Sequence, residues 1–310
     1  MYNYLSDFLV HTLRQNLNVM YAQVHKNGKL IEEYKRMPVK TRLNTWSVSK
    51  GIVACAAGIA IEEGLIKLDE KLIDIFPEYK GVSKYDYIND ITVYHLLTMT
   101  TGLEDAMFFC DGPERYTCQD WVENYFKNGK FVYEPGTHFL YSNHNTFILS
   151  AAIEKRAGQN LLEYLRFRLL EPMGMHNPDW TLSPKGHVHA ANGLYFTIDE
   201  YSAYGEMLLH KGNVNGKQLV PKEFMEKAFS PMVNLKGTQF ENSNGSADAY
   251  GYYFVITKDQ KAIRSDGNYG QVCYVFPEQD MVVTIMSLEG DFGKIYEYAW
   301  EDIAKKIIEE

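Results

Sequence analysis

One stretch, residues 46 to 64 (WSVSKGIVACAAGIAIEEG), constrains the fold of this chain more than any other. It has no charged residue between Gly51 and Ile61, so a helix formed here has no polar face and must lie inside the protein. Six positions in that interval are glycine or alanine, which let neighbouring elements approach closely. Gly64 follows two glutamates and is a typical helix stop. We therefore predict a buried helix around which the other elements pack.

Two reactive side chains stand at the start of this predicted helix. Ser47 and Lys50 are three positions apart, a spacing that puts both on one helix face. The first turn of a helix also offers free backbone N–H groups and a dipole that favours negative charge. A hydroxyl to attack, an amine to take its proton and N–H donors for an oxyanion are the components of acyl transfer. The same residues are equally compatible with a serine cap followed by a lysine that extends to solvent.

Charge and composition narrow the classes of function. The chain has 310 residues, a formal charge of −9 and no lysine- or arginine-rich run, which argues against nucleic acid as its main partner. No apolar run reaches the length that crosses a membrane, and the first residues lack the basic segment and cleavage site of a signal peptide. We therefore expect a cytoplasmic protein with no membrane span.

The cysteines and histidines form no recognisable metal pattern. We expect four reduced thiols, although Cys110 and Cys118 share a loop-like region and could pair. His187 and His189 form a His-x-His pair and His144 precedes them, but no third ligand or acidic partner has a matching spacing. We therefore expect no metal and no cofactor.

The order of the predicted elements indicates an α/β protein of the α+β type. A helix over residues 3–16 and two strands joined at Asn27-Gly28 open the chain, and residues 50 to about 185 are mostly helical. Strand-like runs follow at 251–257, 271–276 and 281–288, with a weaker run at 261–265, and a helix covers 294–308. Residues 234–248 are rich in Gly, Asn and Ser and are predicted to be a surface loop.

Sequential hairpins imply an antiparallel sheet, which the terminal helices can cover while the helical insert makes a second lobe. We predict a sheet-and-helix lobe of residues 1–48 together with 190–310, and a helical lobe of residues 49–189. The two lobes form one continuous structural unit. Because ligand sites are common between lobes, we expect the active site at this junction, where Ser47 lies.

Two further segments carry polar groups suited to the same chemistry. The segment 141–143 (Tyr-Ser-Asn) starts a predicted helix. Near a Ser-Lys pair, a tyrosine hydroxyl can relay a proton and an asparagine amide can hold the lysine and a substrate carbonyl. Taken alone, this segment is better explained by a tyrosine ring that packs against other side chains and by Asn143 as the N-cap of the helix. The segment 265–268 (Ser-Asp-Gly-Asn) lies between two predicted strands, where glycine lets the backbone approach a ligand, although alone it favours a simple hairpin turn.

Taken together, these segments resemble the serine β-lactamase-like and penicillin-binding protein family, especially its class C and esterase-like branch. Ser-Val-Ser-Lys at 47–50, Tyr-Ser-Asn at 141–143 and the turn at Gly267 have the order and rough spacing of that family. The resemblance covers nearly the whole chain. Further segments that resemble the family are 91–103, 135–137 with 141–158, 193–195 with 197, and 270–271 with 277–278.

The resemblance implies a β-lactamase-like fold, with acyl-enzyme chemistry in the groove between the sheet lobe and the helical lobe. It implies that Ser47 is the nucleophile and that Lys50 and Tyr141 activate it, with either of the two as the formal base. The backbone N–H groups of Ser47 and Asn268 would form the oxyanion hole. Asn143 would position Lys50 and the substrate.

One position departs from the family pattern. The third motif begins with Lys or His two residues before its glycine, and in this chain Ser265 stands there before Gly267. Serine offers a hydrogen bond but no charge to hold the carboxylate of a β-lactam or a D-Ala-D-Ala peptide. Arg264 is adjacent, but neighbouring side chains of a strand point to opposite faces. The departure argues against efficient β-lactamase or DD-peptidase action and affects the hydrolysis of neutral esters or amides less.

These features predict a serine hydrolase that cleaves a small-molecule ester, amide or peptide-like substrate through an acyl-Ser47 intermediate. One alternative is a penicillin-binding protein with DD-peptidase activity, or a weak β-lactamase. Another alternative is a non-catalytic ligand-binding protein that retains the fold, which the altered third motif suggests.

Overall fold

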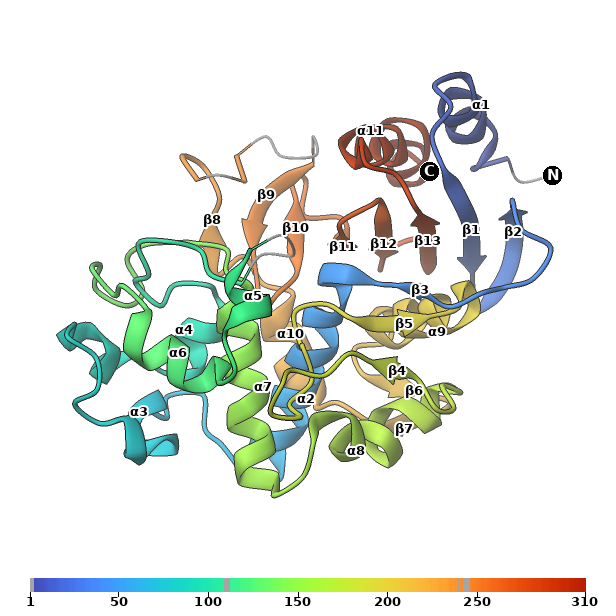
Figure 1. The fold of residues 1–310 in the computed structure, drawn as a ribbon. Helices are drawn as coiled ribbons and strands as arrows, with labels where there is room; N and C mark the ends of the chain where they lie inside the picture. Colours follow the sequence, from blue (N-terminus) through green and yellow to red (C-terminus); the bar gives the residue numbers. More distant parts are fainter. Residues whose placement is uncertain (1–2, 109–111, 239, 242–245) are drawn as a thin grey trace.

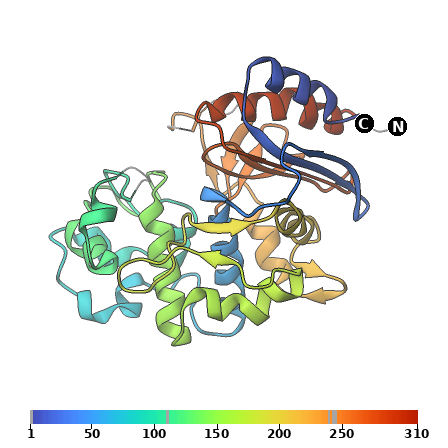
Figure 2. The same ribbon diagram turned by 45° about the vertical axis from the view of Figure 1, so that its right-hand side comes forward.

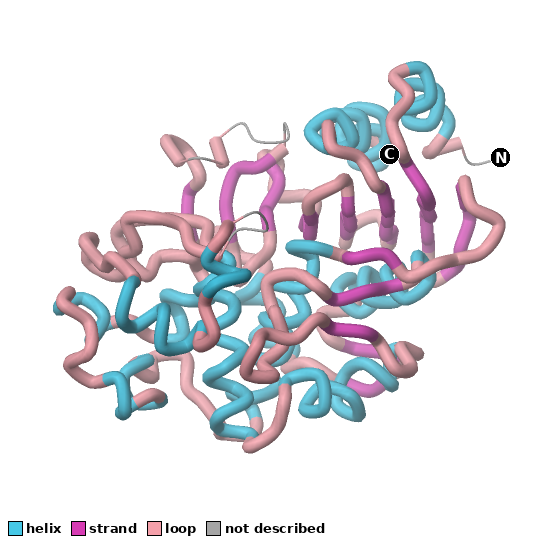
Figure 3. The backbone as a smooth tube through the Cα atoms, in the orientation of Figure 1, coloured by secondary structure: helices cyan, strands magenta, loops and turns pink. Residues whose placement is uncertain are grey.

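The computed structural model of the chain describes all residues except 1–2, 109–111, 239 and 242–245. It contains an eight-stranded antiparallel sheet with the strand order β2-β1-β13-β12-β11-β10-β9-β8 (Figure 1, Figure 3). The strands are β1 (Val19–Lys26), β2 (Lys29–Lys35), β8 (Val233–Asn234), β9 (Ala247–Tyr250), β10 (Val255–Thr257), β11 (Ile263–Gly267), β12 (Gln271–Phe276) and β13 (Met281–Ser287). Because β1 pairs with β13, the two ends of the sequence meet in one sheet, and the predicted antiparallel sheet is confirmed.

Helices from both ends of the chain cover one face of this sheet (Figure 2). They are α1 (Ser6–Arg14), α11 (Phe292–Tyr298), the π-helical turn η6 (Ala299–Ala304) and α12 (Lys305–Ile308). Their apolar side chains, such as Phe8 and Ile303, share a buried core with strand residues such as Val283. The Tyr4 hydroxyl donates a hydrogen bond to Glu310 Oε1 at 2.6 Å, which joins the two chain ends. The predicted terminal helices on the sheet are therefore confirmed.

The opposite face of the sheet packs against α9 (Ile198–Leu209). Thr197 begins this helix with a capping box, in which its Oγ1 accepts from the Glu200 backbone N–H at 3.2 Å and its own N–H donates to Glu200 Oε2 at 2.7 Å. A Cβ on Gly205 would lie 2.5 Å from a methyl carbon of Val282, so the glycine lets α9 lie close to β13. This contact matters for the candidate site because α9 also reaches β11, where Tyr204 lies next to Ser265.

The helical region is built around α2 (Ser49–Glu62). Every residue from Ser49 to Ala60 is buried, which confirms the predicted internal helix. The small residues permit close packing, since a Cβ on Gly58 would lie 2.6 Å from the Phe224 ring. The other helices and helical turns of this region are α3 (Leu72–Ile75), η2 (Pro77–Tyr79), η3 (Asp86–Asp90), α4 (Val93–Leu97), α5 (Glu114–Thr117), α6 (Trp121–Asn128), α7 (Asn143–Ala157), α8 (Leu161–Leu165), η4 (Arg166–Leu170), η5 (Glu171–Met173) and α10 (Lys222–Ala228). None of the described helices is long and apolar enough to cross a bilayer.

Two small sheets connect the eight-stranded sheet with the helical region. One joins β3 (Leu43–Asn44), β5 (Leu194–Phe196) and β4 (Asp179–Trp180), and the other is a hairpin of β6 (Asn213–Val214) and β7 (Lys217–Gln218). Since β3 precedes the turn at Ser47 and β5 follows Ala191, the three-stranded sheet holds two segments of the site together. The division into lobes of residues 1–48 with 190–310 and of residues 49–189 stays a prediction.

The predicted bounds of the loop at 234–248 and of the strand at 251–257 were wrong. The predicted loop at 234–248 includes the start of a strand, because β9 begins at Ala247, and the strand predicted from residue 251 begins only at Val255. Gly251 shows the reason. A Cβ there would lie 2.0 Å from the carbonyl oxygen of Ala228, so the chain turns tightly against the end of α10 between the two strands.

Candidate active site

Ser47 lies in a short 3-10 turn, η1 (Trp46–Val48), immediately before α2. The sequence predicts Ser47 in the first turn of the helix itself, and the structure places it just ahead of that turn. Trp46 is the reason, because its φ of 51° is left-handed and incompatible with a helix that starts there. Lys50 is in the first turn of α2, and its Nζ donates a hydrogen bond to Ser47 Oγ at 2.9 Å. The predicted nucleophile and amine are therefore in direct contact.

Lys50 is almost completely buried, with 1% of its surface exposed. Its Nζ also donates to Asn143 Oδ1 at 2.8 Å and to the carbonyl oxygen of Ala191 at 3.0 Å. Three oxygen atoms thus surround Nζ, and they supply the hydrogen-bond partners that a buried amine requires. The alternative interpretation of Lys50 as a lysine that extends to solvent is therefore wrong.

Asn143, the first residue of α7, is oriented by a second contact. Its Nδ2 donates to the carbonyl oxygen of Phe108 at 2.9 Å, which turns its Oδ1 toward Lys50. The amide is buried, so both of its ends have protein partners. This arrangement agrees with the predicted role of Asn143 in positioning Lys50, while its contact with a substrate stays a prediction.

Tyr141 contacts Lys50 through the face of its ring. The Lys50 Nζ lies 4.7 Å from the ring centroid, within the range of a cation–π interaction. The ring also packs against Phe240 and Tyr250, with centroid distances of 5.0 and 6.4 Å. The structure thus brings Tyr141 to the Ser-Lys pair, and a proton relay through its hydroxyl stays a prediction.

Strand β11 ends directly against the turn that holds Ser47. A Cβ on Gly267 would lie 2.4 Å from the Thr45 carbonyl oxygen and 2.9 Å from the Ser47 backbone nitrogen. Because both of these atoms belong to the backbone, only glycine permits the approach. The chain continues from Gly267 into Asn268, so this contact brings the two predicted oxyanion donors, the N–H groups of Ser47 and Asn268, to the same junction.

Gly267→Ala is expected to lower the rate of the predicted ester hydrolysis about a hundredfold, because displacing a predicted oxyanion donor by about 1 Å has an effect of this order. The added methyl group must push β11 away from η1, and such overpacking destabilises a protein by about 1–3 kcal/mol. Measurement of kcat and of the urea midpoint checks both effects. Gly290→Ala is the control, because a Cβ at Gly290 meets nothing within 4 Å. Wild-type kcat in Gly267→Ala would contradict the close contact at this junction.

Ser265 points toward α9 on one face of β11. It is buried, and its Oγ lies 3.3 Å from the hydroxyl of Tyr204. Arg264 is on the opposite face, as predicted, where its Nε lies 2.6 Å from Asp266 Oδ2 and its Nη1 donates to Ser246 Oγ. Neither Ser265 nor Arg264 therefore places a cation on the face of β11 where the family pattern has Lys or His.

Three groups at the site escaped the sequence analysis. Two are the carbonyl oxygens of Ala191 and Phe108, which fix Lys50 and Asn143. No side-chain pattern indicates that a carbonyl will face a lysine, although the family-like segment that starts at Gly193 lies next to Ala191. The third is a stack of the Trp46 and Tyr269 rings beside Ser47, which only the folded chain brings together.

His144 and His189 each have partners within the protein. His144 is buried with Nε2 2.6 Å from the Trp121 carbonyl oxygen, and burial lowers its pKa to about 3. His189 Nδ1 lies 3.1 Å from both Arg115 and Asn192. Within the described part of the chain, no three His, Cys, Asp or Glu side chains form a group that could hold a metal ion.

The described cysteines, which are Cys55, Cys118 and Cys273, are free thiols, and Cys110 lies outside the described residues.

His187 is expected to make stability pH-dependent. Its hydrogen bond with the buried Glu154 carboxylate raises the pKa of His187 above its ordinary value. A group with a raised folded-state pKa stabilises the protein fully below its unfolded pKa, and this contribution is lost as the pH rises through the folded pKa. The free energy of unfolding should therefore fall by about 1 kcal/mol between about pH 6 and about pH 9, which allows for partial exposure of the ring.

Urea unfolding of Glu154→Gln at both pH values checks this prediction, because the variant should lose the pH-dependent part. His176→Gln, a change at an exposed histidine, is the control and should keep it. An unchanged pH dependence in Glu154→Gln would show that this pair is not its source.

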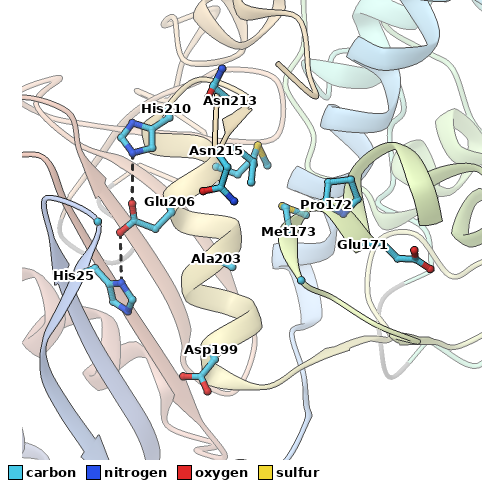
Figure 4. Close-up of a pocket in the computed structure, with 14 residues that line it drawn as sticks. His25, Glu171, Pro172, Met173, Asp199, Ala203, Glu206, His210, Asn213 and Asn215 are labelled. Atoms are coloured by element: carbon cyan, nitrogen blue, oxygen red, sulfur yellow. Dashed lines mark ion pairs between the residues drawn. The ribbon is translucent and has the colours of Figure 1, made fainter. Parts of the chain in front are cut away.

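A cavity of about 560 Å³ is lined by α9, η5, the end of the β1–β2 hairpin and the β6–β7 hairpin (Figure 4). Glu206 lies there between His25 and His210, with nitrogen–oxygen distances of 3.5 and 3.6 Å (Figure 4). None of the predicted catalytic side chains lines this cavity. It is therefore separate from the candidate site around Ser47.

Solved structures share the fold that holds this site. A candidate β-lactamase from Bacteroides dorei DSM 17855 gives a TM-score of 0.83 at 17% identity, with 100% of both chains covered. EstCE1, a hydrolase with promiscuous acyltransferase activity, gives a TM-score of 0.77 at 16% identity, with 97% of both chains covered. At these identities the likeness establishes the fold alone, which is that of the β-lactamase-like class.

The sequence gives the family within this class. The family model described as Beta-lactamase matches residues 8–306 of the chain. The D-aminopeptidase of Brucella anthropi (strain ATCC 49188) is 30% identical over 169 residues, which cover 49% of this chain and 31% of that protein. The chain spans less than two thirds of the length of three curated relatives that it matches, from 31% to 62%. Because the family model covers nearly the whole chain, the protein belongs to the β-lactamase family.

Proposed function

We propose that this protein is a serine hydrolase that cleaves an uncharged ester or amide through an acyl-Ser47 intermediate. One observation carries the proposal: the buried Lys50, fixed by Asn143 and Ala191, has its Nζ 2.9 Å from Ser47 Oγ. Family membership supports it. A D-aminopeptidase among the relatives and a hydrolase with acyltransferase activity among the structural neighbours agree with acyl transfer on this fold.

In this mechanism Ser47 Oγ attacks the substrate carbonyl carbon and loses its proton to the base, which is either Lys50 as a neutral amine or Tyr141 as a phenolate. The negative charge that develops on the carbonyl oxygen is stabilised by the N–H groups of Ser47 and Asn268, and one such donor contributes about 3 kcal/mol. Transfer of the proton to the leaving group releases an alcohol or amine. Water then attacks the acyl-Ser47 ester while the same base takes a proton from the water. The bond between the acyl carbon and Ser47 Oγ breaks, the carboxylic acid leaves, and the base returns the proton to Ser47 Oγ.

The substrate class follows from the charges around the third motif. Ser265 contributes no charge, and the guanidinium of Arg264 is paired with Asp266 on the other face of β11. A carboxylate beside the scissile bond would therefore lack the cation that the family pattern supplies at position 265. We infer that uncharged substrates are favoured over substrates that carry this carboxylate.

A cytoplasmic location of the protein stays a prediction.

Hydrolysis of p-nitrophenyl acetate tests the proposal. We expect a burst of about one p-nitrophenolate per active site followed by slower turnover, because formation and hydrolysis of an acyl-enzyme are separate steps. Heat-unfolded protein is the control for reaction at surface residues. Absence of both burst and turnover in the folded protein would favour the non-catalytic ligand-binding alternative, which the altered third motif suggests.

A penicillin-binding protein or weak β-lactamase is the second candidate, favoured by the family to which the chain belongs. A fluorescent penicillin distinguishes it from the first. Stable labelling of Ser47 by the penicillin would support the second candidate. Good turnover of the neutral ester without penicillin labelling would exclude it.

A further inference from the structure

The rings of Trp46 and Tyr269 pack against each other as a tilted stack, with centroids 4.8 Å apart and ring planes inclined by 31°. Trp46 directly precedes Ser47, and Tyr269 directly follows Asn268. The stack therefore joins the two backbone segments whose N–H groups form the proposed oxyanion hole. Neither ring has a part in the reaction described above.

Both residues have a backbone conformation that large side chains rarely adopt. The φ angles are 51° at Trp46 and 63° at Tyr269, and such left-handed residues persist only where their surroundings hold them. The Trp46 N–H donates to Asn44 Oδ1 at 2.9 Å, and its carbonyl oxygen accepts from Ser49 Oγ at 2.8 Å. The Tyr269 carbonyl oxygen accepts from the Glu289 N–H at 3.2 Å. Each ring is thus presented to the other by a fixed backbone.

Gly267 packs against the same junction. A Cβ there would lie 3.0 Å from Trp46 Cβ and 2.9 Å from the Ser47 nitrogen. A backbone contact and a ring contact therefore both hold the end of β11 against η1. Tyr269 is 40% exposed, so its ring lies outside the core and can be removed without opening a core cavity.

We propose that the Trp46–Tyr269 stack is a clamp that sets the separation of the Ser47 and Asn268 N–H groups. This inference rests on the proposed function, because it assigns the two rings to the oxyanion hole of that reaction. Both are positioning residues, which act through the backbone donors and do not touch the reacting atoms. Misplacement of a donor weakens interactions made in the transition state, so loss of the clamp should lower kcat and leave KM nearly unchanged.

Three variants test the clamp in ester hydrolysis. Tyr269→Ala removes the ring, Tyr269→Phe keeps it, and Tyr87→Ala removes a ring of equal exposure, 40%, on η3. We expect Tyr269→Ala to lower kcat for p-nitrophenyl acetate about tenfold to a hundredfold with KM changed by less than about twofold. The other two variants should retain the wild-type kcat.

Substrates with acyl chains of different length show whether the two rings position the N–H donors or bind the substrate. The clamp predicts the same fractional loss of kcat for p-nitrophenyl acetate and p-nitrophenyl butyrate in Tyr269→Ala. A loss that appears mainly in KM, or that is much larger for the butyrate, would mean that the rings bind substrate and would overturn the clamp. Loss of activity in Tyr269→Phe equal to that in Tyr269→Ala would overturn it as well.

Amide hydrogen exchange in the absence of substrate separates the clamp from the proposed function. Removal of the ring should speed exchange in segments 44–50 and 266–271 of Tyr269→Ala, and Tyr269→Phe should match the wild type. Unchanged exchange at 44–50 in Tyr269→Ala would overturn the clamp even if the protein hydrolyses esters. Faster exchange in a protein whose wild type gives no ester burst would contradict the proposed function and with it the catalytic role of the clamp.

Discussion

Ser47→Ala is expected to abolish ester hydrolysis, with kcat reduced about a thousandfold or more, because the nucleophile of an acyl-enzyme mechanism is lost. The neighbouring hydroxyl cannot replace it. Ser49 Oγ donates toward the carbonyl oxygens of Trp46 at 2.8 Å and Ala190 at 2.7 Å, so it is directed away from Lys50. Steady-state kcat with p-nitrophenyl acetate measures the effect, and near-ultraviolet circular dichroism checks that the fold persists.

Ser83→Ala, a change in a surface turn far along the chain from Ser47, is the matched control and should keep the wild-type kcat. Retention of more than about a tenth of the wild-type kcat in Ser47→Ala would exclude Ser47 as the nucleophile, since residual rates in such variants come only from binding and oxyanion stabilisation.

Lys50→Met is the second change with a large expected effect. Loss of the amine beside Ser47 Oγ removes a proton acceptor, and general base catalysis contributes about a hundredfold to ten-thousandfold. The variant should also be less stable by about 1–3 kcal/mol, because the Asn143 Oδ1 and the Ala191 carbonyl oxygen lose the donor between them. The kcat for p-nitrophenyl acetate and the urea midpoint measure the two effects.

Lys67→Met, at an exposed lysine just beyond α2, controls for the loss of a positive charge and should change neither quantity. If Lys50→Met loses the expected stability of about 1–3 kcal/mol but keeps its kcat, Lys50 has a structural role only. In that case Tyr141, whose ring lies beside the Lys50 Nζ, would be the remaining candidate base.

The helix at the centre of the fold was predictable because its pattern is local. An uncharged run of small and branched residues has only one environment in a folded protein, and α2 is buried from Ser49 to Ala60. The contact of Ser47 with Lys50 also follows from spacing along the chain. The start of the helix was less predictable, because nothing in the sequence marks Trp46 for its φ of 51°.

The rest of the site depends on contacts between distant segments. Strand β11 was only a weak prediction because Arg264, Ser265 and Asp266 interrupt its apolar pattern. The structure explains how such a strand is buried: Arg264 pairs with Asp266 on one face, and Ser265 meets Tyr204 on the other. The carbonyl oxygen of Ala191, which completes the environment of Lys50, carries no side-chain signal at all.

Intact-mass analysis after reaction with a fluorophosphonate tests the acyl-Ser47 mechanism most directly. The reagent phosphonylates activated serines, so the mechanism predicts one adduct per chain, located at Ser47 by peptide mapping and absent from Ser47→Ala. It also predicts that Lys50→Met reacts far more slowly than the wild type. No adduct on the folded wild-type protein, under conditions that fully label a known serine esterase, would contradict the mechanism, and so would an adduct on any other residue.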